Sequence, residues 1–193
     1  MKTPPSFRRS GFTLVELLVV IAIIMVLAGA GFAAGGAAMN KARKVTAQAT
    51  AQSVVSAINS FVTENAALPV PQGAATTDGG TEYKTDKGDG LKILEVLTGL
   101  EDQINTRKVK YLTVKDGKAN KDGIIYSKSG KEVLGLYDPW GNTFVMVLDT
   151  NYEDRLKVKV GSSGEVILNG KRAAVYSAGA DKKLGTSDDV KTW

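Results

Sequence analysis

The chain has 193 residues, with 25 Lys and Arg against 20 Asp and Glu, and it contains neither His nor Cys. The length allows one domain of ordinary size with an appendage. The missing residue types exclude imidazole acid–base catalysis, thiolate nucleophiles, disulfides and zinc sites built from Cys and His. An enzyme built on this chain would need carboxylates, Lys, Tyr or Ser.

A long apolar segment dominates the N-terminal part of the chain. Residues 17–38 form a run of 22 residues without a charged side chain. At about 1.5 Å per residue, a helix of this length covers roughly 33 Å, enough for the hydrocarbon core of a bilayer. The sequence therefore predicts one membrane-spanning helix over about residues 17–38. A cleaved secretory signal is the alternative, although the apolar part of such a signal is normally shorter.

One acidic residue, Glu16, precedes this apolar run directly. A carboxylate at that depth costs on the order of a few kcal/mol unless it is paired, so such a residue usually has a function. The alternative is that the Glu16 side chain reaches the membrane surface and does nothing further. Basic residues do not decide the orientation of the segment, because three stand on each side of it.

The string from Arg8 to Leu17, Arg-Arg-Ser-Gly-Phe-Thr-Leu-Val-Glu-Leu, closely resembles the processing site of type IV prepilins and of the pseudopilins of type II secretion. The resemblance implies that residues 1–11 are a leader peptide. A prepilin peptidase would cut between Gly11 and Phe12 on the cytoplasmic face, and the new Phe12 amine would be N-methylated. The rest of the chain would then lie on the outer side of a bacterial inner membrane.

The physical chemistry of the motif agrees with this interpretation. In an assembled filament, the Glu16 carboxylate of one subunit could pair with the Phe12 amine of a neighbour, which offsets the cost of burying each charge alone. Loss of the leader lowers the net charge from +5 to +2, because residues 1–11 hold three basic side chains and no acidic one. We therefore expect no nucleic-acid partner.

The helical pattern continues beyond the apolar run. Apolar residues recur at steps of four and three over residues 47–61, and no Pro occurs between Phe12 and Pro69. The sequence thus predicts one helix over residues 12–66. Its first half is apolar all round and would lie in lipid or against other helices, whereas its second half has one stripe that can pack on a globular head.

Residues 67–193 are expected to form that head. Residues 74–90 resemble a surface loop, and Leu91, Leu94 and Leu97 suggest a short amphipathic helix that ends near Gly99. Alternating apolar residues and turn signals predict strands at 111–114, 124–126, 143–148, 156–160, 165–168 and 173–176, with a hairpin turn at Asn169-Gly170 and a weaker one at Asp116-Gly117. The predicted class is α+β, a long N-terminal helix with a C-terminal antiparallel sheet, and the resemblance implies a pilin-like fold.

Residues 137–144, Tyr-Asp-Pro-Trp-Gly-Asn-Thr-Phe, place turn-forming residues around one large aromatic side chain. By pattern alone this is a turn held by a buried Trp, without chemistry. The string also resembles the Asp-Pro-Trp-Gly-Asn turn of major pseudopilins. We interpret it as structural.

The C-terminal segment, residues 176–193, contains Asp181, Asp188 and Asp189 in a loop with glycines. Such a loop could bind Ca²⁺, which takes six to eight oxygen ligands, but the spacing is not that of an EF-hand. The pattern alone favours a solvated acidic turn. The segment resembles the calcium loop of major pseudopilins, which implies Ca²⁺ held by these three carboxylates and by the main-chain carbonyls of Ala178 and Thr186. The adjacent Lys182 and Lys183 depart from that resemblance.

Motifs of catalysis are missing from the sequence. It has no P-loop, no Ser-x-x-Lys and no Gly-x-Gly-x-x-Gly. We therefore predict that the chain is not an enzyme. The resemblance implies a structural subunit, a single-pass inner-membrane protein with a periplasmic head that polymerises into a pseudopilus for type II secretion. Expected partners are further copies of the chain, minor pseudopilins, the prepilin peptidase and an inner-membrane assembly platform. A type IV pilus subunit for adhesion, motility or DNA uptake, and a membrane-tethered binding module, are the alternatives.

Overall fold

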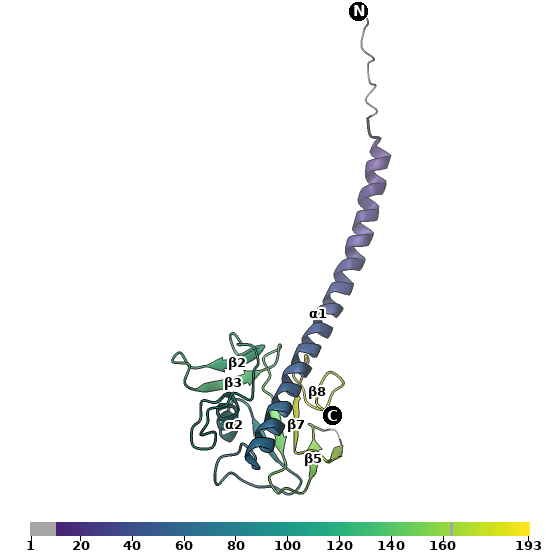
Figure 1. Cartoon of the computed structure of the whole chain (residues 1–193). Coiled ribbons are helices and arrows are strands. Elements are labelled where there is room, and N and C mark those ends of the chain that lie inside the picture. Colours follow the sequence, from purple (N-terminus) through teal and green to yellow (C-terminus); the bar gives the residue numbers. More distant parts are fainter. Residues whose placement is uncertain (1–10, 163) are drawn as a thin grey trace, which may run out of the picture. The chain divides into compact units, whose positions relative to one another are not determined.

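The computed structural model describes residues 11–162 and 164–193, and for residues 30–34 it describes the backbone alone (Figure 1). The elements in chain order are α1 (Leu14–Asn65), β1 (Thr81–Lys84), α2 (Asp89–Thr98), β2 (Gly123–Tyr126), β3 (Val133–Tyr137), β4 (Val145–Leu148), β5 (Arg155–Lys159), β6 (Glu165–Asn169), β7 (Ala173–Ser177) and β8 (Val190–Lys191). The predicted class, α+β with one long N-terminal helix, is confirmed. Helix α1 contributes to two compact units, which divide between Lys41 and Ala42.

Helix α1 ends close to where the sequence places its end. After Asn65, Ala66 adopts a left-handed conformation (φ 54°) and its N–H donates to the Val62 carbonyl at 2.9 Å. A left-handed residue just past the last turn is a common helix stop, although Gly is the usual residue there because it lacks a Cβ. Pro69 follows shortly after and cannot continue a helix.

The outer part of α1 belongs to the core of the unit formed by residues 42–193. The apolar stripe predicted at Ala47, Ala51, Val54, Ile58 and Phe61 is buried, with residues at most 1 % exposed, and the neighbouring Ala57 and Val62 are buried as well. These residues share one cluster with α2 and with one face of the main sheet. The ring of Phe61 also meets that of Tyr111 edge to face, at 5.3 Å between centroids. The packed unit therefore begins well before residue 67.

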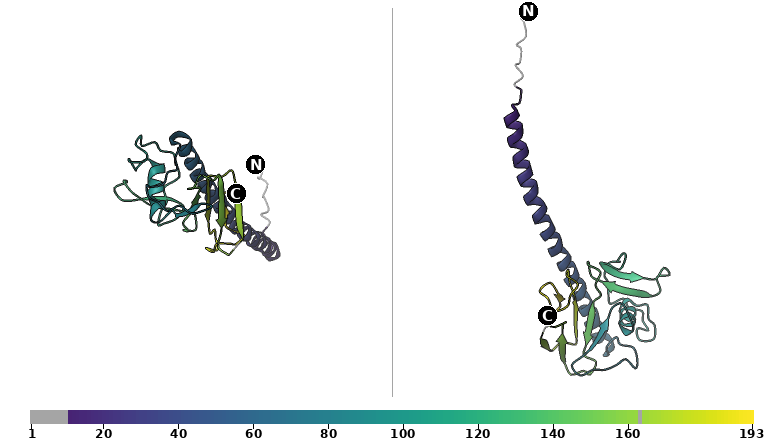
Figure 2. Two further views of the ribbon diagram at one scale, coloured as in Figure 1. Left: turned by 90° about the horizontal axis from the view of Figure 1, so that it is seen from below. Right: turned by 180° about the vertical axis from the view of Figure 1, so that it is seen from behind.

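The main sheet is antiparallel, with strand order β1-β4-β7-β8. Successive side chains of a strand point to opposite faces, so a central strand buried on both sides needs two hydrophobic layers. In β4, Met146 and Leu148 join the cluster of α1 and α2, whereas Val145 and Val147 join a second cluster under the β5–β6 hairpin. In the views of Figures 1 and 2, α2 lies beside the β2–β3 hairpin, while β5, β7 and β8 lie together near the C-terminus.

Several local predictions are wrong. Residues 111–114 form no strand, because the N–H groups of Tyr111 and Leu112 donate to the carbonyl of Leu97 at the end of α2 instead of pairing with a strand. The segment expected to be a surface loop contains β1, an edge strand of four residues, and β3 and β8 were not expected. Strand β1 has four residues and pairs with β4, more than 60 positions later, and β8 has only two residues. Local periodicity is therefore weak in them.

Both predicted hairpin turns are also wrong. The turn at Asn169-Gly170 does not join paired strands, because β6 pairs with β5 while β7 pairs with β4. Near Asp116-Gly117, the chain instead pairs Lys118 with Lys121, and Asp116 bridges to Ile124 in parallel. Turn residues mark a change of direction, but which strands pair is decided by the hydrophobic faces that they bury.

The predicted membrane segment is helical in its backbone throughout residues 17–38. Among the residues whose side chains the structure describes, no helix is long and apolar enough to cross a membrane. The predicted leader, including Arg8 and Arg9, lies outside the described residues except for Gly11.

Candidate functional site

The predicted cleavage position lies just before α1. Gly11 and Phe12 precede the first helical residue, Leu14, and both are exposed, Phe12 by 80 %. A Cβ added at Gly11 would meet no atom within 4 Å. Exposed non-helical chain is where proteases act most readily. The peptide bond between Gly11 and Phe12 is therefore accessible.

Glu16 closes the first turn of α1. The Thr13 N–H and hydroxyl donate to Glu16 Oε2 at 2.8 and 2.7 Å, and the Glu16 N–H donates back to the Thr13 hydroxyl at 3.3 Å. This is a capping box, in which the N-cap and third residues satisfy each other's free N–H groups. The Thr-x-x-Glu spacing is visible in the sequence, but the capping role of Glu16 was not predicted from it. Because no hydrogen bond from the described residues reaches Glu16 Oε1, this oxygen remains available to an external partner.

An apolar surface follows Glu16 on all sides of the helix. Twelve large apolar side chains between Leu14 and Leu27 are 45–82 % exposed. A water-soluble helix normally has one polar face, and an exposed apolar surface of this extent marks contact with lipid or with other proteins. This part of α1 needs such a partner to remove its surface from water.

Asp138 organises the turn at residues 137–144. It is fully buried, and its Oδ1 accepts the N–H groups of Trp140 and Asn142 at 2.9 and 2.8 Å. Its Oδ2 accepts the Asn142 side-chain amide at 2.8 Å and the Ser177 hydroxyl at 2.6 Å. Trp140, expected to be the buried centre, is only partly buried against the core. The Asp138 carboxylate, rather than the Trp140 ring, is therefore the centre of the hydrogen bonds that hold the turn.

The same turn contacts the C-terminal loop. The Asn142 amide nitrogen also donates to the Gly179 carbonyl, at 2.7 Å. Gly179 has φ 68°, and a Cβ there would come within 2.3 Å of the Asp188 carbonyl oxygen. The two strings that the sequence analysis considered separately thus form one hydrogen-bonded unit. No signal in a single sequence connects them, because 37 residues separate Asn142 from Gly179.

The three aspartates of the C-terminal loop differ in their surroundings. Both oxygens of Asp188 have a partner, since Oδ1 accepts the Thr186 hydroxyl and Oδ2 accepts the Asp181 N–H at 2.8 Å. The Thr186 hydrogen bond is the main cause that lowers the pKa of Asp188. Asp181 is exposed and accepts the Lys183 N–H at 2.7 Å. Both carboxylates therefore accept hydrogen bonds from within the loop.

Asp189 is different because its side chain is only 1 % exposed. Its Oδ2 accepts the Gly185 N–H at 3.0 Å and pairs with the Lys191 ammonium at 3.2 Å. Its Oδ1 is buried without a hydrogen-bond partner. A buried carboxylate oxygen without a partner is costly, so this atom is the feature of the loop that most favours a bound cation.

The described side chains of the loop are nevertheless not arranged as a complete set of metal ligands. Within the described residues, no group of three or more acidic, His or Cys side chains is arranged to hold a metal ion. Of the two predicted carbonyl donors, Ala178 is 8 % exposed at the end of β7 and Thr186 lies on the loop beside Asp188. A bound cation would require the Asp188 and Asp181 side chains to exchange their present hydrogen bonds for the ion.

The C-terminal segment is attached to α1. The Lys44 ammonium donates to the Ser187 carbonyl at 3.0 Å, and the Gln52 amide donates to the Thr192 carbonyl at 3.4 Å. Trp193 meets the ring of Tyr176 edge to face, at 6.2 Å between centroids. The C-terminal side of the loop is therefore held by α1 and by Tyr176, whereas the Asn142 amide holds its beginning at Gly179.

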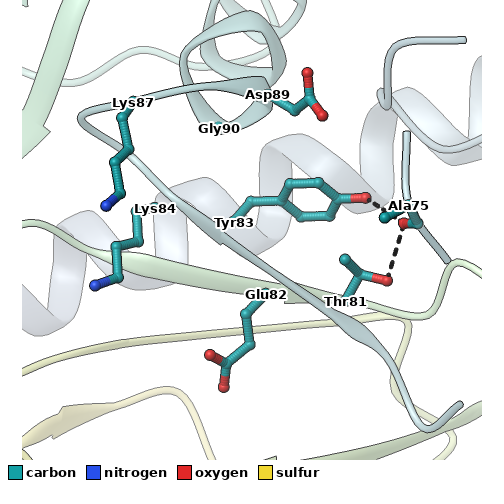
Figure 3. Close-up of a pocket in the computed structure, with 8 residues that line it drawn as sticks. All are labelled: Ala75, Thr81, Glu82, Tyr83, Lys84, Lys87, Asp89 and Gly90. Carbon is teal, nitrogen blue, oxygen red and sulfur yellow. Dashed lines mark hydrogen bonds between the residues drawn. The ribbon is translucent and has the colours of Figure 1, made fainter. Parts of the chain in front are cut away.

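A separate cavity of about 370 Å³ lies beside β1 (Figure 3). The Tyr83 hydroxyl donates to the Ala75 carbonyl at 3.3 Å and extends away from Lys84 and Lys87. Burial raises the pKa of Tyr83, which disfavours its reactive phenolate form. The charged groups that line the cavity do not converge on one point, so it has no arrangement of a nucleophile with its base.

Comparison with known proteins identifies the N-terminal segment. Residues 6–32 match the model of the prokaryotic N-terminal methylation motif. The match covers Gly11, Phe12 and Glu16, and it is the type of N-terminus found in type IV pilins and pseudopilins. No curated protein and no solved structure matches the chain significantly.

Proposed function

We propose that this chain is a structural subunit that is cleaved between Gly11 and Phe12, methylated on the Phe12 amine and then polymerised through the first part of α1. The match of residues 6–32 to the N-terminal methylation motif carries the proposal. The exposed Gly11–Phe12 bond and the apolar surface of α1 support it. The subunit has no catalytic role of its own.

Assembly replaces one apolar environment by another. Before assembly, the subunit resides in the inner membrane, with α1 crossing it once over about residues 17–38 and the head in the periplasm. In the filament, neighbouring helices cover the surface that lipid covered before, so little apolar area returns to water. The new Phe12 amine of one subunit pairs with Glu16 of another, through the oxygen that the capping box leaves available.

Among filaments with this N-terminus, we favour the pseudopilus of type II secretion. The buried Asp138 turn, the acidic C-terminal loop and the absence of Cys are the supporting features. Further copies of the chain, minor pseudopilins, the prepilin peptidase and an inner-membrane assembly platform would be its partners. A type IV pilus subunit for adhesion, motility or DNA uptake uses the same processing motif and is the second candidate.

We further propose that the C-terminal loop binds Ca²⁺. Asp181, Asp188 and Asp189 would supply carboxylate oxygens, and Ala178 and Thr186 would supply carbonyls. The buried, unpartnered Asp189 Oδ1 supports this proposal. A bound ion supplies positive charge that compensates buried carboxylates, and it stabilises the folded loop by mass action.

The processing test combines mass spectrometry with a matched pair of variants. The full chain is expressed with a prepilin peptidase, and we expect a mature N-terminus at Phe12 that carries one added methyl group. Gly11→Val should retain the leader, because the added side chain blocks the peptidase without disturbing any contact in the fold. Ser10→Ala is the control and should be cleaved normally. An uncleaved wild-type chain contradicts the proposed function.

Two variants of Glu16 separate charge pairing from helix capping. Glu16→Gln removes the charge but keeps a side chain that can close the capping box, whereas Glu16→Ala removes both. If charge pairing drives assembly, both variants lose filaments in cross-linking and electron microscopy. If capping alone matters, the Gln variant assembles normally and the pairing model is wrong. Exoprotein release in a secretion-deficient strain, compared with surface pili, then distinguishes the two filament classes.

A further inference from the structure

We propose that the Lys191 ammonium serves as a built-in counter-cation of the C-terminal loop, so that the loop closes without a divalent ion and any such ion must compete with Lys191 for Asp189. The second half of this statement rests on the calcium binding proposed above, whereas the first half does not.

Asp189 is a buried acidic residue of the C-terminal loop. Its side chain is 1 % exposed, and a carboxylate removed from water to this extent needs a compensating charge. The cation in contact with it is Lys191, at 3.2 Å from Oδ2, and the Lys191 side chain is still 31 % exposed. The ammonium thus compensates the buried carboxylate and stays partly hydrated, which reduces its own desolvation cost.

The main sheet fixes the backbone position of Lys191. It lies on β8, whose register pairs Lys191 with Tyr176 and Val190 with Ser177 on β7. Asp189 immediately precedes β8, so the strand pairing fixes the backbone of both partners. The fold of the loop therefore brings the backbones of both partners of the ion pair close to each other.

Hydrogen bonds from donors within the protein hold the rest of the loop. The Thr186 hydroxyl and the Asp181 N–H each donate to one oxygen of Asp188, and the Lys44 ammonium from α1 donates to the Ser187 carbonyl. Apart from Asp189 Oδ1, no buried side-chain oxygen of the described part of the loop lacks a partner. The Lys191 ammonium beside Asp189 is enough to keep the loop folded, although Asp189 Oδ1 is left without a hydrogen-bond partner in the described part of the chain.

This arrangement predicts how an added cation acts. A divalent ion that reaches Asp189 Oδ1 meets the positive charge of Lys191 at the neighbouring oxygen, and like charges at such short range repel strongly in a buried site. Lys191 must turn outward before the ion binds. The wild-type loop should hence be stable in a chelator and respond weakly to Ca²⁺.

The test is hydrogen exchange of the segment 178–189, measured by mass spectrometry on the full chain in detergent micelles, in EDTA and with added CaCl₂. In EDTA we expect Lys191→Gln to exchange at least about tenfold faster than the wild type, because the buried carboxylate loses its cation. Lys191→Arg should restore protection. Lys183→Gln is the matched control, since it removes an equal charge from the same loop but no ion pair of the described residues.

Calcium titration of the same variants completes the test. If Ca²⁺ binds, Lys191→Gln should bind it about tenfold more tightly than the wild type and regain its protection. The proposal is overturned if the wild type and Lys191→Gln exchange at the same rate in EDTA. It is also overturned if the Lys183→Gln control loses as much protection from exchange as Lys191→Gln. The absence of a calcium effect in every variant contradicts the calcium proposal alone, because the comparison in EDTA still decides the role of Lys191.

Discussion

Replacement of Asp138 by Ala should destabilise the head severely. The change removes the acceptor of four hydrogen bonds, from the N–H groups of Trp140 and Asn142, the Asn142 amide and the Ser177 hydroxyl. Asp138 and Ser177 are both fully buried, so water does not replace the lost acceptor easily. At about 1 kcal/mol for each donor left without a partner, the loss is about 4 kcal/mol, a large part of the 5–15 kcal/mol that stabilises a typical domain.

Two further variants grade the effect. Asp138→Asn keeps Oδ1 for the two backbone donors and loses only the Oδ2 side, so we expect about 2 kcal/mol. Ser177→Ala removes one of the Oδ2 donors and should cost about 1 kcal/mol. Because both changes act on one oxygen, the double variant should lose less than the sum of the two.

The assay is urea unfolding of the full chain in detergent micelles, followed by circular dichroism and by the fluorescence of its two tryptophans, Trp140 in the same turn and Trp193. The control is Asp102→Ala, a side chain that is 68 % exposed, whose removal should change stability by less than about 0.5 kcal/mol. If Asp138→Ala costs no more than this control, the hydrogen-bond network does not hold the turn, and the argument is refuted.

Three other predictions concern the helix end, the core and the pH dependence. Ala66→Gly should raise stability by about 0.5–1 kcal/mol in the same urea assay, because Gly adopts the left-handed conformation at φ 54° without a steric penalty; a lower stability would contradict this. Phe61→Ala should lower it by about 3–5 kcal/mol, since Phe61 is 1 % exposed in the main cluster, and a loss below about 1 kcal/mol would disprove its place in the core. Burial raises the pKa of Tyr176, with the nearby Glu82 carboxylate adding to the effect, so the unfolded chain releases this proton first and stability falls as the pH rises above about 10. Melting curves between pH 8 and 11 should therefore decline less steeply for Tyr176→Phe than for the wild type, and parallel declines would argue against the raised pKa.

The sequence was most informative where structure depends on neighbouring residues. The extent of α1 follows from the absence of Pro, the apolar stripe at residues 47–61 and the breaker at Pro69, all of which act within a few residues. Strand β5, with its alternating Leu156, Lys157 and Val158, was found for the same reason. The methylation motif is also local, and it lies in residues 6–32.

The sequence was least informative where a residue depends on a distant partner. Strand β1 has four residues and exists through its pairing with β4, more than 60 positions later, so its own pattern resembles a loop. The hairpin expected at Asn169-Gly170 does not form. Strand β6 pairs with β5, whereas β7 pairs with β4 and buries its residues in both hydrophobic clusters.

The long helix, the α+β class and the N-terminal methylation motif can be predicted from sequence, because each depends on residue types at short, fixed spacings. The link that Asp138 and Asn142 form between the central turn and the C-terminal segment, and the burial of Asp189 beside Lys191, are visible only in the folded chain. Burial and pairing of a polar group depend on which distant surfaces pack around it. The residue type gives the charge of a side chain, but the packing of the whole fold determines whether that side chain is removed from water.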